Sequence, residues 1–166
     1  IGWDSSNLYL AVQVTDDKLV QVSSGVSLYK GDEVEIMLDT SLSDDFYIHY
    51  LSQDDYQIGL SPGNFGSLPP GNYRFFPRNI SGPQSSIVIK AQTTSKAYMC
   101  SHFELWLVFG LSLPPSGSRF GFALAISDND QAGVASQQSM VAIISGYRLA
   151  DPTTWGTLAH ESPTAI

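Results

Sequence analysis

The sequence predicts an all-β fold, an antiparallel β-sandwich of the jelly-roll type, and three observations carry this prediction. Short runs alternate between apolar and polar residues with a period of two, as in Leu8–Thr15. No window of comparable length has apolar residues at helical spacing. Clusters of Gly, Pro, Asn and Ser separate the runs at close intervals, as a sandwich of many short strands requires.

Seven runs are predicted to form strands, in chain order Leu8–Thr15, Glu33–Asp39, Phe46–Leu51, Tyr56–Leu60, Ile87–Ala91, Phe103–Phe109 and Phe120–Ser127. Strand parity turns Val34, Ile36 and Leu38 of the second run toward the core. The last run places Phe120, Phe122, Leu124 and Ile126 on one face. The segment Ser61–Asn72 is rich in Gly, Pro and Ser and is predicted to be an ordered surface loop.

Length and composition favour one domain over residues 1–166. Eight Lys and Arg against sixteen Asp and Glu give a net charge of -8, which repels polyphosphate and argues against nucleic acid as a partner. The longest apolar runs, such as Val141-Ala142-Ile143-Ile144, are far shorter than the ~20 residues that cross a bilayer, so membrane insertion is not expected.

The second predicted strand carries several acids on the face opposite its core residues. Glu33, Glu35 and Asp39 share that face with Met37. Three carboxylates side by side repel one another unless something offsets their charge. Either the face is solvated, or it holds the hydroxyls of a ligand or a cation.

Acids that fit a hard cation occur at two further places. Asp128 and Asp130 open a loop with the spacing D-x-D-x-x-G, and Asp17 follows Asp16 in a turn after the first strand. The loop is not an EF-hand, because Ser139 stands where that motif requires a bidentate Glu. A structural Ca²⁺ loop and a turn rich in Asp and Asn remain open as alternatives.

The sequence does not predict an enzyme. His49, His102 and His160 are scattered, and no G-x-S-x-G, H-E-x-x-H or Gly-rich phosphate loop occurs. A pair of acids can always be chosen from sixteen, so a nominal glycosidase pair carries no weight.

Five stretches together resemble the family 9 carbohydrate-binding modules. They are Trp3-Asp4-Ser5-Ser6-Asn7-Leu8-Tyr9-Leu10-Ala11-Val12-Gln13-Val14-Thr15-Asp16-Asp17, Tyr29-Lys30-Gly31-Asp32-Glu33-Val34-Glu35-Ile36-Met37-Leu38-Asp39, Phe103-Glu104-Leu105-Trp106-Leu107, Gly121-Phe122-Ala123-Leu124-Ala125-Ile126-Ser127-Asp128-Asn129-Asp130 and Asp151-Pro152-Thr153-Thr154-Trp155-Gly156-Thr157-Leu158. The resemblance implies a β-sandwich of an extracellular or cell-surface protein. It also implies a sugar held between aromatic rings, with Ca²⁺ supporting the structure.

The resemblance also implies the residues of a sugar site. Tyr29 resembles the first stacking ring, and Asp16 and Glu35 match acids that accept hydrogen bonds from sugar hydroxyls. Gln57 stands where a sugar-binding member has Arg. The second ring aligns near Leu149, with Tyr147 two residues away. We therefore expect a non-catalytic module that binds carbohydrate.

Two other functions stay open at this point. The chain resembles in outline the β-sandwiches that bind haem through Met or His, and Met37, Met99 and Met140 are available as ligands. Such sandwiches also serve as structural or assembly modules of extracellular proteins, in which sugar binding has been lost.

A final expectation concerns strand pairing. By resemblance, family members have further strands before the Trp3-Asp4 motif, so this chain is expected to lack the first strands of the sandwich. The run Leu8–Thr15 would then have an unpaired edge. A strand from upstream residues or from another subunit is expected to pair with it.

Overall fold

The computed structural model describes residues 1–166 except 45, 94–96, 102–106, 112 and 162–166. Regular structure in the described residues is almost entirely β. Its helical elements are four 3₁₀ turns, η1 (Gly25–Lys30), η2 (Arg78–Ile80), η3 (Leu107–Phe109) and η4 (Pro152–Thr154). The predicted all-β antiparallel class is confirmed.

The larger sheet has six strands, all antiparallel to their neighbours, and β4 (Glu33–Asp39) lies near its centre. The others are β5 (Asp55–Ser61), β6 (Gly71–Phe76), β9 (Ser118–Asp128), β10 (Ser139–Ala142) and β11 (Gly156–His160). The strand order is β10-β9-β4-β5-β6, and β11 pairs with a different stretch of the long strand β9.

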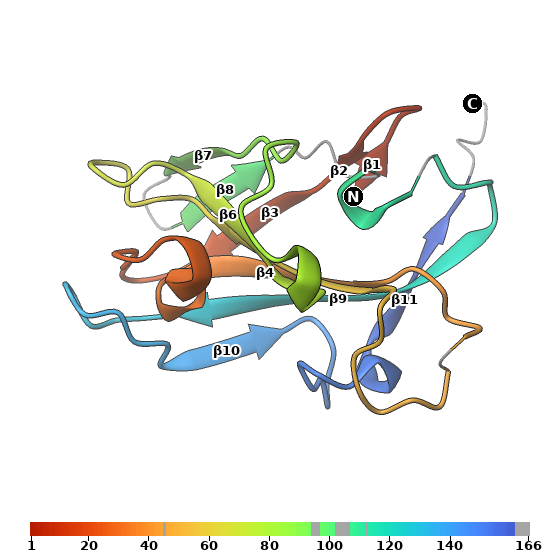
Figure 1. Ribbon diagram of the computed structural model, residues 1–166. Coiled ribbons are helices and arrows are strands. Elements are labelled where there is room, and N and C mark those ends of the chain that lie inside the picture. The colour runs from red at the N-terminus through yellow and green to blue at the C-terminus, as the bar shows by residue number, and fades with distance from the viewer. Residues whose placement is uncertain (45, 94–96, 102–106, 112, 162–166) are drawn as a thin grey trace.

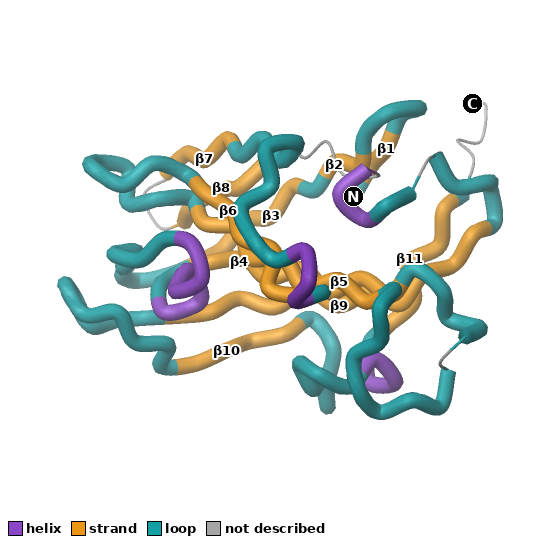
Figure 2. The backbone as a smooth tube through the Cα atoms, in the orientation of Figure 1, coloured by secondary structure: helices purple, strands orange, loops and turns teal. Residues whose placement is uncertain are grey.

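A second, smaller layer lies over one face of the larger sheet, as Figures 1 and 2 show. It consists of β3 (Ala11–Thr15), β8 (Ala97–Ser101) and β7 (Lys90–Thr93), in the order β3-β8-β7. The short strands β1 (Gly2–Trp3) and β2 (Leu8–Tyr9) pair with each other. The two layers make the sandwich.

The main core fills the space between the layers. Val34, Ile36 and Leu38 of β4 are buried there, as their parity predicts. Phe120 and Leu124 are buried in the same cluster, and Phe122 and Ile126 pack against it. The inward faces of both strands are therefore as predicted.

The opposite face of β4 is buried too, which the sequence did not settle. Met37, Ala123, Ala125 and Trp155 form a second cluster there, against which residues of β10 and of the segment before η4 pack. Beneath this cover Glu33, Glu35 and Asp39 are at most 2% exposed. Of the two alternatives for this face, the one in which solvent covers it is therefore wrong.

Besides Leu8–Thr15, three predicted strands differ from the structure. Phe46–Leu51 lies in turns and loop, because β4 already has β5 and β9 on its two edges and offers no third place. The run Ile87–Ala91 overlaps β7 only at its end. Most of Phe103–Phe109 lies outside the described residues, and its last three residues form η3.

The first predicted strand is interrupted at Leu10. Its first part, β2, pairs with β1, and its second part, β3, pairs with β8, so the two parts belong to different sheets. Strands β6, β10 and β11 were not predicted. No helix in the described residues is both long enough and apolar enough to span a bilayer.

Candidate functional site

A cavity of about 430 Å³ opens beside β4 on the face away from the smaller layer. Three of the predicted sugar-site residues line it together. Tyr29 comes from η1, Glu35 from β4 and Gln57 from β5. The remaining lining residues are Leu51, Phe75, Phe76, Arg78, Gln137, Met140, Leu149 and Ala150.

Glu35 supplies the acceptor of this cavity. Its side chain is 1% exposed, and its Oε1 accepts a short hydrogen bond from Gln57 Nε2. Its Oε2 has no hydrogen-bond partner among the described residues. Burial raises the pKa of Glu35, and the bond from Gln57 opposes that rise in part. A buried oxygen without a partner can accept a hydroxyl from a ligand.

Tyr29 supplies an aromatic face at the rim of the cavity. Its ring is 37% exposed and meets Phe75 edge to face, with 6.1 Å between centroids. Phe75 in turn packs against Tyr73, with 5.2 Å between centroids. The chain of contacts fixes the ring while part of it stays open to solvent.

Tyr147 takes a different position from a stacking ring. It packs against the second core cluster, and its hydroxyl is buried without a hydrogen-bond partner in the part of the chain that the structure describes. Burial, and then the charge of Glu35, raise the pKa of Tyr147. Leu149 lines the cavity instead, and among the described lining residues Tyr29 is the only Tyr or Trp.

Glu33 lies next to this site and was not predicted as part of it. It is fully buried, and neither carboxylate oxygen has a hydrogen-bond partner among the residues described. Burial raises its pKa well above the ordinary value, with a further rise from Glu35. Gly59 on β5 leaves the space that this carboxyl occupies. Alternation put Glu33 on the correct face, but it did not indicate that this face is buried as well.

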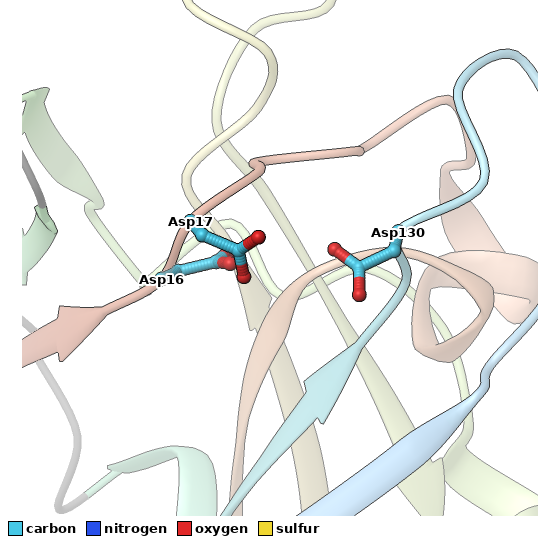
Figure 3. Close-up of side chains that lie close together, drawn as sticks. All are labelled: Asp16, Asp17 and Asp130. Atoms are coloured by element: carbon cyan, nitrogen blue, oxygen red, sulfur yellow. The ribbon is translucent and has the colours of Figure 1, made fainter.

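Asp16 is not part of this cavity and lies with other acids. Its carboxylate comes within 4.8 Å of those of Asp17 and Asp130, and separately of those of Asp32 and Asp128. Figure 3 shows Asp16 and Asp17, at the end of β3, directed toward Asp130 across a gap. The two predicted cation sites, the turn and the loop, are thus one cluster in space.

Asp32 joins this cluster although the sequence marked it only as a turn residue. It is 1% exposed and accepts hydrogen bonds from the backbone N–H of Val20 and of Asn129. Burial raises the pKa of Asp32 to about 7, and the charges of Asp16 and Asp128 add to the rise. The one feature of the sequence that could have predicted the burial of Asp32 is its position directly before the buried strand β4.

A larger and more apolar groove, of about 900 Å³, separates β3 from β9 and β10. Val12 and Val14 line one side, and Leu124, Ile126, Val141 and Ile143 line the other. Asp16, Asp17 and Asp128 stand at one end. The groove opens into the space between the two layers.

Among the described residues, the candidate haem ligands do not gather around one of these spaces, and Met140 alone of them lines the cavity beside β4. Met37 is fully buried in the second cluster, and Met140 packs against it. His160 is buried, and its ring lies 4.7 Å from that of Trp3. Met99 and His102 belong to the part whose side chains are not described.

A two-layer β-sandwich with a half-open aromatic ring beside a buried, partly unpaired carboxyl has the build of a carbohydrate-binding module. The family model described as carbohydrate family 9 binding domain-like matches residues 1–161. The chain belongs to this family, and the family is one of non-catalytic carbohydrate-binding modules.

Two solved structures have the same fold, both family 9 modules from Caldicellulosiruptor kristjanssonii. The first, in complex with cellotriose, has 18% identity and a TM-score of 0.67, over 98% of this chain and 73% of that one. The second, in complex with glucose, has 17% identity and a TM-score of 0.63, over 98% and 76%. Among curated proteins no match was found.

Proposed function

We propose that this chain binds the end of a carbohydrate chain in the cavity lined by Tyr29, Glu35 and Gln57. One observation carries the proposal. A partly exposed ring lines a cavity whose buried carboxyl has one oxygen without a hydrogen-bond partner among the described residues. The apolar face of a pyranose stacks on such a ring, and its hydroxyls bond to such oxygens.

The residues that line the cavity offer both hydrogen-bond donors and acceptors to the hydroxyls of a sugar. Glu35 accepts, Gln57 both donates and accepts, and Arg78 adds a cationic donor at the rim. Asp16, which was predicted as a second acceptor, is assigned to the cation cluster instead. The fold shared with modules solved with cellotriose and with glucose supports a glucan as the first ligand to test. We further propose that the module acts outside the cell, as part of a secreted or cell-surface protein.

Calorimetric titration of the chain with cellotriose and with glucose tests the proposal. Replacing Tyr29 with Ala should weaken binding by ~1–3 kcal/mol, because it removes the stacking face. Phe65→Ala is the matched control, since Phe65 is 42% exposed and does not line the cavity. If Tyr29→Ala binds as the unaltered chain does, the site is misplaced. If a glycan array shows no binding at all, a structural or assembly module is the better assignment.

We also propose that the acidic cluster binds Ca²⁺ as a structural cofactor. Its donors are carboxylate oxygens, the ligands that hard cations prefer. They come from the turn after β3, the residue before β4, the last residue of β9 and the loop that follows β9. Burial is the main cause of the raised pKa of Asp32, and a cation there would offset the smaller rise caused by the charges of Asp16 and Asp128. Asp16 lies close both to Asp17 and Asp130 and to Asp32 and Asp128. The proposed Ca²⁺ ligands are therefore these five acids.

Thermal unfolding with EDTA and with added Ca²⁺ tests the cofactor. A cation that binds only the folded state should raise the melting temperature as its concentration rises. Asp16→Asn should abolish that rise, whereas Glu161→Gln, at an exposed acid outside the cluster, should leave it intact. Coincident melting curves for the unaltered chain would show that the acids bind no Ca²⁺.

A further inference from the structure

The loop that joins β4 to β5, residues 40–54, presents three aromatic side chains to solvent. Phe46 is 63% exposed, Tyr47 84% and Tyr50 67%. The rings of Phe46 and Tyr47 meet edge to face, with 5.0 Å between centroids. Large aromatic residues that are exposed together are a common mark of a binding surface. We call the segment 46–50, which carries these three residues, the aromatic loop.

Hydrogen bonds hold both ends of this loop. The N–H of Thr40 donates to the carbonyl of Asp54 at 3.1 Å, which closes its base. The N–H of Ser52 donates to a carboxylate oxygen of Asp55 at 2.6 Å. A surface held in place before binding loses less entropy when a ligand arrives.

The aromatic loop is continuous with the cavity of the proposed sugar site. Leu51, directly after Tyr50, lines that cavity, and so does Ala150. His49 Nδ1 lies 3.2 Å from the carboxylate of Asp151, which follows Ala150. This contact ties the loop to the cavity wall, and in Figure 1 the loop passes beside η4.

The chemistry of the loop fits a neutral ligand that offers ring faces and hydroxyls. The segment 46–52 contains neither Lys, Arg, Asp nor Glu. It therefore has no Lys or Arg to attract phosphate or an anionic lipid, and its one histidine, His49, faces the carboxylate of Asp151. Tyr47 and Tyr50 combine an apolar face with a hydroxyl, the pairing that a sugar ring requires.

The cavity is too small to hold a whole glycan chain. At about 430 Å³ it is near the lower end of the range of small-molecule pockets, ~300–1,000 Å³. A long polymer does not fit inside it and must leave across the rim.

From these observations we infer that the aromatic loop binds the outer sugar rings of a glycan whose end occupies the cavity. Tyr47 and Tyr50 then select for chain length. The inference rests on the proposed function, because the cavity must hold the end of the chain.

Calorimetry of the 166-residue chain with glucose and with cellohexaose tests this inference. Cellohexaose should bind more tightly than glucose. The double variant Tyr47→Ala with Tyr50→Ala should lose about tenfold in affinity for cellohexaose and stay within about twofold for glucose. Replacing both with Phe should restore most of the loss, and Phe65→Ala should change neither affinity.

Several results would overturn the inference. In one, the unaltered chain binds both sugars but the double variant weakens them equally or not at all. In another, light scattering shows a dimer that the double variant abolishes, which assigns the loop to a second copy of the chain. If the unaltered chain binds neither sugar, the proposed function falls with the inference, and this result is distinct from the other two.

Discussion

Gly59 determines whether Glu33 fits in the sheet. A Cβ at this position would lie 2.3 Å from Glu33 Oε2 and 2.8 Å from Phe75 Cε2. Both neighbours are packed, so neither can move freely. Gly59→Ala should therefore lower the free energy of unfolding by about 1–3 kcal/mol, measured by urea denaturation.

Gly71, on the neighbouring strand β6, is the matched control, because a Cβ there would meet nothing within 4 Å. Gly71→Ala should be close to neutral. Equal loss in both variants would show that strand glycines matter here only through the backbone.

Glu33 itself should make stability depend on pH. Burial raises its pKa well above the ordinary 4.5, so the folded chain holds a proton that the unfolded chain releases. The contribution of Glu33 is complete below pH 4.5 and is lost as pH rises toward the raised pKa. Glu33→Gln should flatten this decline in urea denaturation between about pH 4 and pH 8. An unchanged slope would mean that Glu33 is not the proton-binding group.

At the scale of elements, β3 is an edge strand with an apolar groove beside it. It forms the edge of the smaller layer, with no partner opposite β8 among the described residues, and the apolar groove runs along it. Val141 and Ile143 across the groove are 66% and 62% exposed. We predict that an extended strand with alternating apolar residues pairs with β3 and covers this groove.

Amide hydrogen exchange tests the state of this edge. In the 166-residue chain as a monomer, amides of β3 that do not bond to β8 should exchange much faster than those of β4, which is paired on both sides. Slow exchange in an oligomer would point to a strand from another subunit. Slow exchange throughout β3 in a monomer would contradict the prediction.

At the scale of the whole molecule, alternation predicted β4, β5 and β9, which have a neighbouring strand on both sides, and missed the edge strands β6 and β10. β4 and β9 bury one face in the main core, so their period of two is clear. Phe46–Leu51 has a strand-like composition, yet the sheet has no free edge beside β4 for it. A local pattern carries no information on which edges are already occupied.

Only part of the candidate site could be predicted, because the sequence pattern does not show which distant segments come together. Tyr29, Glu35 and Gln57 were found through a resemblance, and the structure brings them to one cavity. Asp16 was assigned to the sugar, whereas its neighbours in space are acids from segments distant in sequence. Glu33 and Asp32 are buried because other segments of the chain cover them, and strand parity alone does not predict that cover.

Mapping the ligand by NMR tests the central claim most directly. Titration of the ¹⁵N-labelled 166-residue chain with cellotriose should shift the amide signals of Tyr29, Glu35, Gln57 and Leu149, which surround the cavity. Signals of Val12, Val14 and Val141, along the apolar groove, should stay in place. The absence of any shift, or shifts confined to the groove, would contradict a sugar site in the cavity beside β4.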